Sequence, residues 1–126
     1  MPTWRGACHC GRVAFEVEAE PTHLSECNCS LCHKKGALYL PVSEIHAVRI
    51  LEGQEQLTEY RFNTGTARHF FCRNCGVHVL HRPRVAPERW SVNARCLEGV
   101  DLDALPRQAF DGRNWEASAR AEGWNG

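Results

Sequence analysis

The sequence has no net charge, no long apolar run and very few lysines. Its 126 residues include fifteen basic and fifteen acidic side chains, and only two of the basic ones, Lys34 and Lys35, are lysine. A neutral chain has little electrostatic attraction for nucleic acid or an anionic membrane, so we expect neither as a partner. No apolar run approaches the roughly 20 residues that a membrane-spanning helix requires.

The first residues also lack the apolar core that a signal peptide carries. We therefore expect a cytoplasmic protein, in which thiols stay reduced, and a single zinc-binding domain over residues 1–126. Eight cysteines in such a chain point to metal binding rather than to disulfide bonds.

Seven of the eight cysteines fall into three clusters. These are Cys8 with Cys10, a trio made of Cys27, Cys29 and Cys32, and Cys72 with Cys75. The first and third clusters each end in a glycine, Gly11 or Gly76, which permits the tight turn that aims two sulfurs at one point. We predict that these two clusters share one structural zinc and stitch the first strand to a later one. A division of the ligands across the clusters is the alternative.

The trio then has three thiolates, one fewer than a tetrahedral zinc binds. We predict a second zinc there, and so two zinc ions per chain, with a fourth position open to water, a side chain or a substrate thiol. A thiol bound to zinc is deprotonated. Lys34 and Lys35 follow the trio directly and are expected to attract an anionic thiol. His33 is a candidate proton shuttle, although a solvated surface residue is an equally good interpretation.

We interpret the remaining chemistry-bearing side chains as structural. Three histidines lie at strand-like positions, where hydrogen-bonded structural histidines are expected: His69, His78 and His81. His9 is expected to be exposed and Cys96 to be a buried apolar filler. Trp90 and Trp115 are assigned to the core rather than to a substrate-binding surface.

Short apolar runs, separated by glycine and proline, predict a mostly-β domain with short helical turns. The expected strands cover 13–17, 24–27, 37–42, 48–51, 57–62, 67–71, 77–81 and 90–93. A helical turn within 28–35, ended by Gly36, is expected to carry the trio. Ser43 is predicted to cap a brief turn over 44–47, and a weak helix is predicted over 117–122.

The cysteine motifs occur in the order and spacing of a known family. They are Gly6-Ala7-Cys8-His9-Cys10-Gly11-Arg12-Val13, Cys27-Asn28-Cys29-Ser30-Leu31-Cys32 with Gly36, and Phe71-Cys72-Arg73-Asn74-Cys75-Gly76. Phe110-Asp111-Gly112 followed by Trp115 is similar to the family's C-terminal signature. Over about residues 6–115 the chain resembles the glutathione-dependent formaldehyde-activating enzyme family, which includes the centromere protein V-like proteins.

The resemblance implies a zinc-bearing β-sheet fold of the β-tent type. In that family, the positions that match Cys8, Cys10, Cys72 and Cys75 bind a structural zinc, and those that match the trio bind a second zinc at the active site. The family's named activity condenses formaldehyde with glutathione to S-hydroxymethylglutathione, and it is classed as a carbon–sulfur lyase.

Our leading hypothesis is therefore a zinc-dependent enzyme that acts on a thiol adduct, with glutathione and a small carbonyl as substrates. The zinc of the trio would bind the substrate thiolate, which would attack formaldehyde or another small carbonyl. The rival hypothesis is a non-catalytic zinc module that carries thiols or contacts a protein partner. An exposed apolar patch at the trio, without a pocket, would favour the rival.

Overall fold

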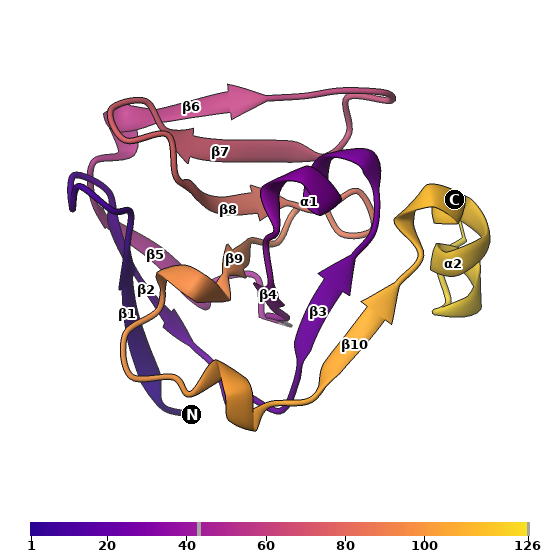
Figure 1. Ribbon diagram of the computed structural model, residues 1–126, viewed down its shortest axis with the longest axis horizontal. Helices are drawn as coiled ribbons and strands as arrows, with labels where there is room; N and C mark the ends of the chain where they lie inside the picture. The colour runs from indigo at the N-terminus through magenta and orange to yellow at the C-terminus, as the bar shows by residue number, and fades with distance from the viewer. Residues whose placement is uncertain (43, 126) are drawn as a thin grey trace.

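Ten short strands form two sheets in the computed structural model, which describes residues 1–42 and 44–125. The smaller sheet is antiparallel and has the order β1-β2-β5: β1 (Thr3–Ala7), β2 (Ala14–Glu18) and β5 (Val48–Glu52). The larger sheet has the order β10-β3-β4-β9-β8-β7-β6 and curves away from it (Figure 1). Its strands are β3 (Leu24–Cys27), β4 (Tyr39–Leu40), β6 (Leu57–Tyr60), β7 (Arg68–Cys72), β8 (His78–Arg82), β9 (Ser91–Asn93) and β10 (Arg107–Phe110).

The helical segments are all short. The two α-helices are α1 (Ser30–Lys35) and α2 (Trp115–Ala121), and the 3₁₀ turns are η1 (Gln54–Gln56), η2 (Ala94–Cys96), η3 (Leu102–Ala104) and η4 (Gly112–Asn114). The expected mostly-β fold with short helical turns is confirmed. Within the described residues, the helices fall short of the length and apolar character needed to cross a membrane.

The main core lies between the two sheets. Phe15 and Val17 on β2 are fully buried, whereas Glu16, between them, is half-buried and pairs with Arg49 on β5. On the larger sheet, fully buried Leu80 belongs to the same apolar cluster. The burial of Phe15 and Val17 on either side of Glu16 is the period-two alternation of a strand with one face on the core. Each fully buried side chain of this size stabilises the fold by about 2–3 kcal/mol.

The segment that carries the trio folds as the sequence predicts. Strand β3 ends at Cys27, and α1 ends at Gly36, which has φ 65° and whose amide donates to the carbonyl of Cys32. A left-handed residue at this position is the usual way for a helix to end, and glycine adopts it without a steric penalty. Strand β4 is shorter than expected, at Tyr39–Leu40. The predicted cap at Ser43 lies outside the described residues.

Two strands were not predicted, β1 at the start of the chain and β10 near its end. Strand β10 has the sequence Arg-Gln-Ala-Phe, three of its four residues are exposed, and it shows no alternation that would signal a strand. It becomes a strand because it pairs in parallel with β3, with Gln108 opposite Ser25 and Phe110 opposite Cys27. This pairing brings the C-terminal part of the chain beside the trio, with α2 at the far end of β10 (Figure 1). Helix α2 begins at Trp115, two residues before the predicted helix.

Candidate functional site

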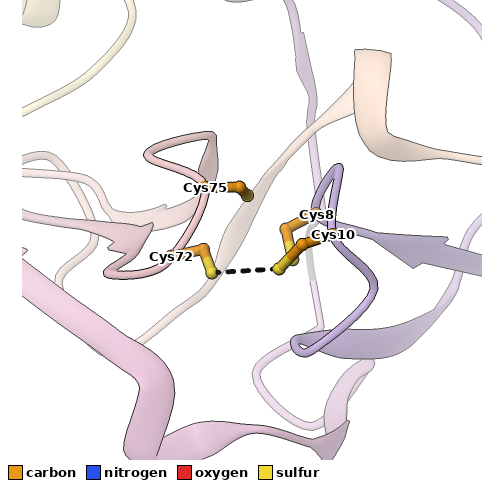
Figure 2. A group of neighbouring side chains, drawn as sticks. All are labelled: Cys8, Cys10, Cys72 and Cys75. Atoms are coloured by element: carbon orange, nitrogen blue, oxygen red, sulfur yellow. Dashed lines mark hydrogen bonds between the residues drawn. The ribbon is translucent and has the colours of Figure 1, made fainter.

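The structure separates the seven clustered cysteines into two groups. The first is called here the four-cysteine cluster (Figure 2). It contains Cys8 and Cys10 from the loop between β1 and β2, Cys72 at the end of β7, and Cys75 from the turn between β7 and β8. Its four sulfur atoms all lie within 4.8 Å of one another. The Sγ atom of Cys10 is 3.6 Å from that of Cys8 and 3.7 Å from that of Cys72.

These separations fit a zinc ion. Two sulfurs at the corners of a tetrahedron around zinc, with Zn–S bonds of about 2.3 Å, are about 3.8 Å apart. Both turns use a left-handed glycine, Gly11 with φ 80° and Gly76 with φ 77°. The amide of Val13 donates to Sγ of Cys8 at 3.4 Å, which favours the thiolate form that a metal binds. The four-cysteine cluster therefore has the donor set and spacing of a closed structural site.

The second group is the trio, which also has its three sulfurs within 4.8 Å of one another. Cys27 ends β3, Cys29 is the N-cap of α1 and Cys32 is buried in the first turn of α1. The amide of Cys29 donates to Sγ of Cys27 at 3.4 Å, and the amide of Cys32 donates to Sγ of Cys29 at 3.3 Å. No further Cys, His, Asp or Glu in residues 1–42 and 44–125 joins this group. The trio thus offers a zinc ion three thiolate ligands.

The trio also polarises its own thiols. Hydrogen bonds from the thiols of Cys27 and Cys32 lower the pKa of Cys29. The hydrogen bonds that Cys27 makes with Cys29 and Cys32 raise the pKa of Cys27. The hydroxyl of Tyr39 lies 3.3 Å from Sγ of Cys32. Burial, together with the charge of Cys32, raises the pKa of Tyr39 well above its usual range, so the phenol stays protonated and donates to the sulfur.

Gly112 closes one side of the trio. A Cβ atom at this position would lie 2.5 Å from Sγ of Cys27 and 2.8 Å from Cβ of Cys29, so a larger residue would displace the ligands. The side-chain amide of Asn28 donates to Asp111 at 3.0 Å, which ties the loop of the trio to the C-terminal segment. The Phe110–Trp115 motif therefore forms a wall of this group, a role that only its pairing beside β3 reveals.

A cavity of about 450 Å³ opens beside the trio, within the size range of small-molecule sites. The trio lies in its wall together with Tyr39, Phe62, His69, His81, Arg84, Arg89, Trp90, Gly112 and Trp115. The expectation that Trp90 and Trp115 belong only to the core is wrong for Trp115 and incomplete for Trp90, which contacts both core and cavity. Their apolar rings gave no indication that α2 and β9 would face a cavity.

Two arginines also lie in the cavity wall. The guanidinium of Arg84 stacks over the ring of Trp115 at 3.9 Å and pairs with Glu116 at 3.4 Å. Arg89 pairs with Glu88 at 3.7 Å. Neither arginine was predicted to be a site residue, because thirteen arginines are spread along the chain and no motif distinguishes these two from the others.

The residues that follow the trio separate in space. His33 and Lys34 are exposed, and His33 lines a second, smaller hollow that is also lined by Cys27 and Cys32. Lys34 lines neither hollow. Lys35 is half-buried, with its Nζ atom 3.2 Å from Nδ1 of His69, and burial lowers its pKa to about 8. The structure therefore brings Lys35, but not Lys34, against a residue of the cavity wall.

The three strand histidines are buried, but they are not all hydrogen-bonded as expected. His69, His78 and His81 are 6%, 9% and 9% exposed. Within the described residues, Nε2 of His78 and Nδ1 of His81 have no hydrogen-bond partner. Their neighbours are mainly one another and Tyr39, with ring centroids 4.4–6.1 Å apart.

Of the two other structural interpretations, that of His9 is confirmed and that of Cys96 is confirmed in part. His9 is exposed. Cys96 is half-buried rather than buried, but it packs against the main core, with its Sγ atom 3.5 Å from the carbonyl oxygen of His78, and burial raises the pKa of its thiol to about 11. A thiol that remains protonated behaves as an apolar filler.

Comparison with known proteins agrees with the cysteine motifs. The family model described as glutathione-dependent formaldehyde-activating enzyme matches residues 3–111. The chain is also similar to a Rhodobacter sphaeroides protein of known crystal structure, which was a Northeast Structural Genomics target. That protein is 39% identical with a TM-score of 0.73, and the match covers 82% of this chain and 99% of the other. The chain therefore belongs to the glutathione-dependent formaldehyde-activating enzyme family.

Proposed function

We propose that this protein is a zinc-dependent enzyme of the carbon–sulfur lyase type that joins glutathione, or another small thiol, to formaldehyde or another small carbonyl. The observation that carries the proposal is the trio, which supplies three cysteine ligands in the wall of a 450 Å³ cavity. Family membership supports glutathione-dependent formaldehyde activation in general.

The two cysteine groups have different roles in this proposal. Cys8, Cys10, Cys72 and Cys75 would hold a structural zinc, and Cys27, Cys29 and Cys32 a second one at the active site. When bound at the trio, zinc would stabilise the thiolate form of a substrate thiol. The protein itself orients the trio through the amides of Cys29 and Cys32 and through the hydroxyl of Tyr39.

The charges of the cavity suit an anionic thiol. Glutathione carries two carboxylates, and Arg84 and Arg89 present guanidinium groups in the wall. Arginine binds carboxylates through paired N–H groups, which makes it suitable for orienting such a substrate. Lys35 adds positive charge close to His69. Exposed Lys34 would contribute long-range attraction, and His33 would exchange protons with solvent from the outer side of the trio.

The rival hypothesis of a non-catalytic zinc module predicts an apolar patch without a pocket at the trio. The pocket and its polar groups favour the enzyme instead. A surface that binds another protein can be flat, whereas a substrate-binding site is concave and carries a few convergent polar groups.

The test is the rate at which purified, zinc-loaded protein forms S-hydroxymethylglutathione from formaldehyde and glutathione. Exchange spectroscopy by NMR would measure the rate at equilibrium, and calorimetry would measure glutathione binding. We expect acceleration over the uncatalysed reaction and saturable binding. A protein that neither accelerates the reaction nor binds glutathione would refute the enzyme and support the module.

A further inference from the structure

The histidine cluster, defined as His69, His78 and His81, lies beside the trio on neighbouring strands. His69 is on β7, and the other two are on β8. The rings of His69 and His81 are stacked, with centroids 5.3 Å apart and planes 5° from parallel. Each of the three residues is more than nine-tenths buried. His69 and His81 line the same cavity as the trio, whereas His78 does not.

Lys35 sets the hydrogen-bonding state of His69. Its Nζ atom lies 3.2 Å from Nδ1 of His69. Burial and the nearby charge of Lys35 lower the pKa of His69 to about 4, so its ring is neutral near pH 7. A protonated lysine can only donate, so Nδ1 is the acceptor and the ring proton is on Nε2. The charge of Lys35 also polarises the ring and strengthens Nε2–H as a donor.

This part of the cavity wall has unused hydrogen-bonding capacity. Within the part of the chain that the structure describes, Nδ1 of His69 contacts Lys35 and Nε2 makes no hydrogen bond, although the residue lines the cavity. Buried polar groups are hydrogen-bonded in the great majority of cases, so a cavity-lining N–H without a protein partner is available to a substrate atom. Phe62 packs against His69 with ring centroids 5.7 Å apart, which keeps the surroundings of this polar corner apolar.

We propose that His69, oriented by Lys35 and flanked by His81, forms the site that receives the carbonyl oxygen of the second substrate. This inference rests on the proposed function, in which the trio binds the thiol, and it names the residue that binds the carbonyl substrate. His69 is then a catalytic residue that touches the substrate, and Lys35 is a positioning residue.

The step is balanced without any further reactant. A lone pair of the substrate thiolate sulfur forms the new C–S bond, and the π pair of the C=O bond moves to oxygen. Nε2–H of His69 donates a hydrogen bond to the negative charge that develops there. The oxygen then takes a proton from water, which balances the proton that the thiol released to solvent. A neutral imidazole suffices, because it donates a hydrogen bond and transfers no charge.

The test compares His69→Phe, which keeps an aromatic ring of similar size, with His69→Gln, which keeps an N–H donor. We expect His69→Phe to lower kcat/KM for formaldehyde roughly 100-fold, as the loss of one such donor does in other enzymes, with glutathione affinity unchanged. His69→Gln should recover part of the loss. His78→Phe makes the same change in the histidine cluster but outside the cavity wall, and it should leave turnover near that of the wild type.

The role of Lys35 is tested through its dependence on His69. Lys35→Met should lower turnover in the same direction as His69→Phe, and Lys35→Arg should restore part of it. At saturating glutathione, the double variant Lys35→Met with His69→Phe should have the same kcat as His69→Phe alone, because Lys35 acts on the carbonyl step through the imidazole.

The outcomes separate this inference from the proposed function. A wild-type protein that does not accelerate the reaction would overturn both. An active wild type with fully active His69→Phe would overturn the inference alone. So would a His69→Phe variant that loses glutathione binding as strongly as turnover, or a His78→Phe variant that loses as much activity, because either result would indicate a purely structural role.

Discussion

The two cysteine groups offer the same kind of donor atom, the cysteine sulfur, but their surroundings differ. The four-cysteine cluster joins two loops that are far apart in sequence, and it supplies as many ligands as a tetrahedral zinc takes. The trio comes from six consecutive positions and stands in a cavity wall beside Tyr39 and the C-terminal segment. The two groups therefore differ in the number of thiols that they offer a metal ion and in what surrounds those thiols, and our proposal of a stabilising and a reactive site rests on this difference.

The largest expected effect comes from breaking the four-cysteine cluster. Cys72 is fully buried, and Cys72→Ser removes one of four ligands. A structural zinc contributes about 10 kcal/mol or more, comparable with the whole stability of a small domain. We expect the variant to lose its cooperative thermal transition in calorimetry or circular dichroism. Cys96→Ser, outside the cluster, is the control and should unfold like the wild type. A cooperative Cys72→Ser transition at the wild-type temperature would contradict the structural role.

Breaking the trio should instead affect chemistry more than folding. Cys29→Ala should reduce the zinc content from two ions per chain to about one, as measured by mass spectrometry of the metal. It also removes the N-cap of α1, which costs about 1 kcal/mol and a few degrees of melting temperature. Turnover should fall at least 100-fold. Ser30→Ala, at the next position, should keep both zinc ions and activity, and an unchanged zinc content in Cys29→Ala would rule out the site.

A pair of glycine variants sharpens the comparison. Gly112→Ala places a methyl group against Cys27 and Cys29, so we expect zinc affinity at the trio to fall roughly 10- to 100-fold, as measured by competition with a chelator. Gly76→Ala has open space around the added methyl group, but its φ of 77° is left-handed. It should cost about 1–2 kcal/mol of stability without displacing a ligand. Equal zinc affinities of Gly112→Ala and the wild type would show that the C-terminal wall does not position the trio.

The smallest expected effect concerns the pH dependence of folding. Burial lowers the pKa of His78 to about 3, below its ordinary value near 6.5, so the unfolded chain binds more protons between these values. Stability from this group is therefore fully present above pH 6.5 and is lost as pH falls toward 3. Between pH 7 and 5.5 the wild type should lose about 1 kcal/mol more than His78→Phe in urea unfolding. Parallel losses in both proteins would show that His78 titrates as it does in the unfolded chain.

The local features of the site could be predicted from the sequence. The spacing of the cysteines predicted both groups, Gly36 predicted the end of α1, and alternating apolar residues predicted β2. These features depend on interactions between residues that are close in sequence, such as caps, tight turns and side chains two apart on a strand.

The surroundings of the trio could not be predicted, because they depend on contacts between distant segments. Strand β10 has no apolar alternation and is a strand only through its pairing with β3. That pairing places Gly112 against Cys27, and the register of β7 and β8 stacks His69 on His81. From the sequence, Gly112 was only part of a C-terminal motif, and the histidines were interpreted as structural.

The sequence by itself determined which cysteines could bind metal, because the capacity to bind a metal depends on residue type and short spacing. Only the tertiary structure decided what faces those ligands: a cavity, two arginines and a buried pair of imidazoles beside Lys35. The physical reason is that hydrogen bonding, burial and pKa are set by neighbours in space, and the packing of the two sheets and the C-terminal segment chooses those neighbours.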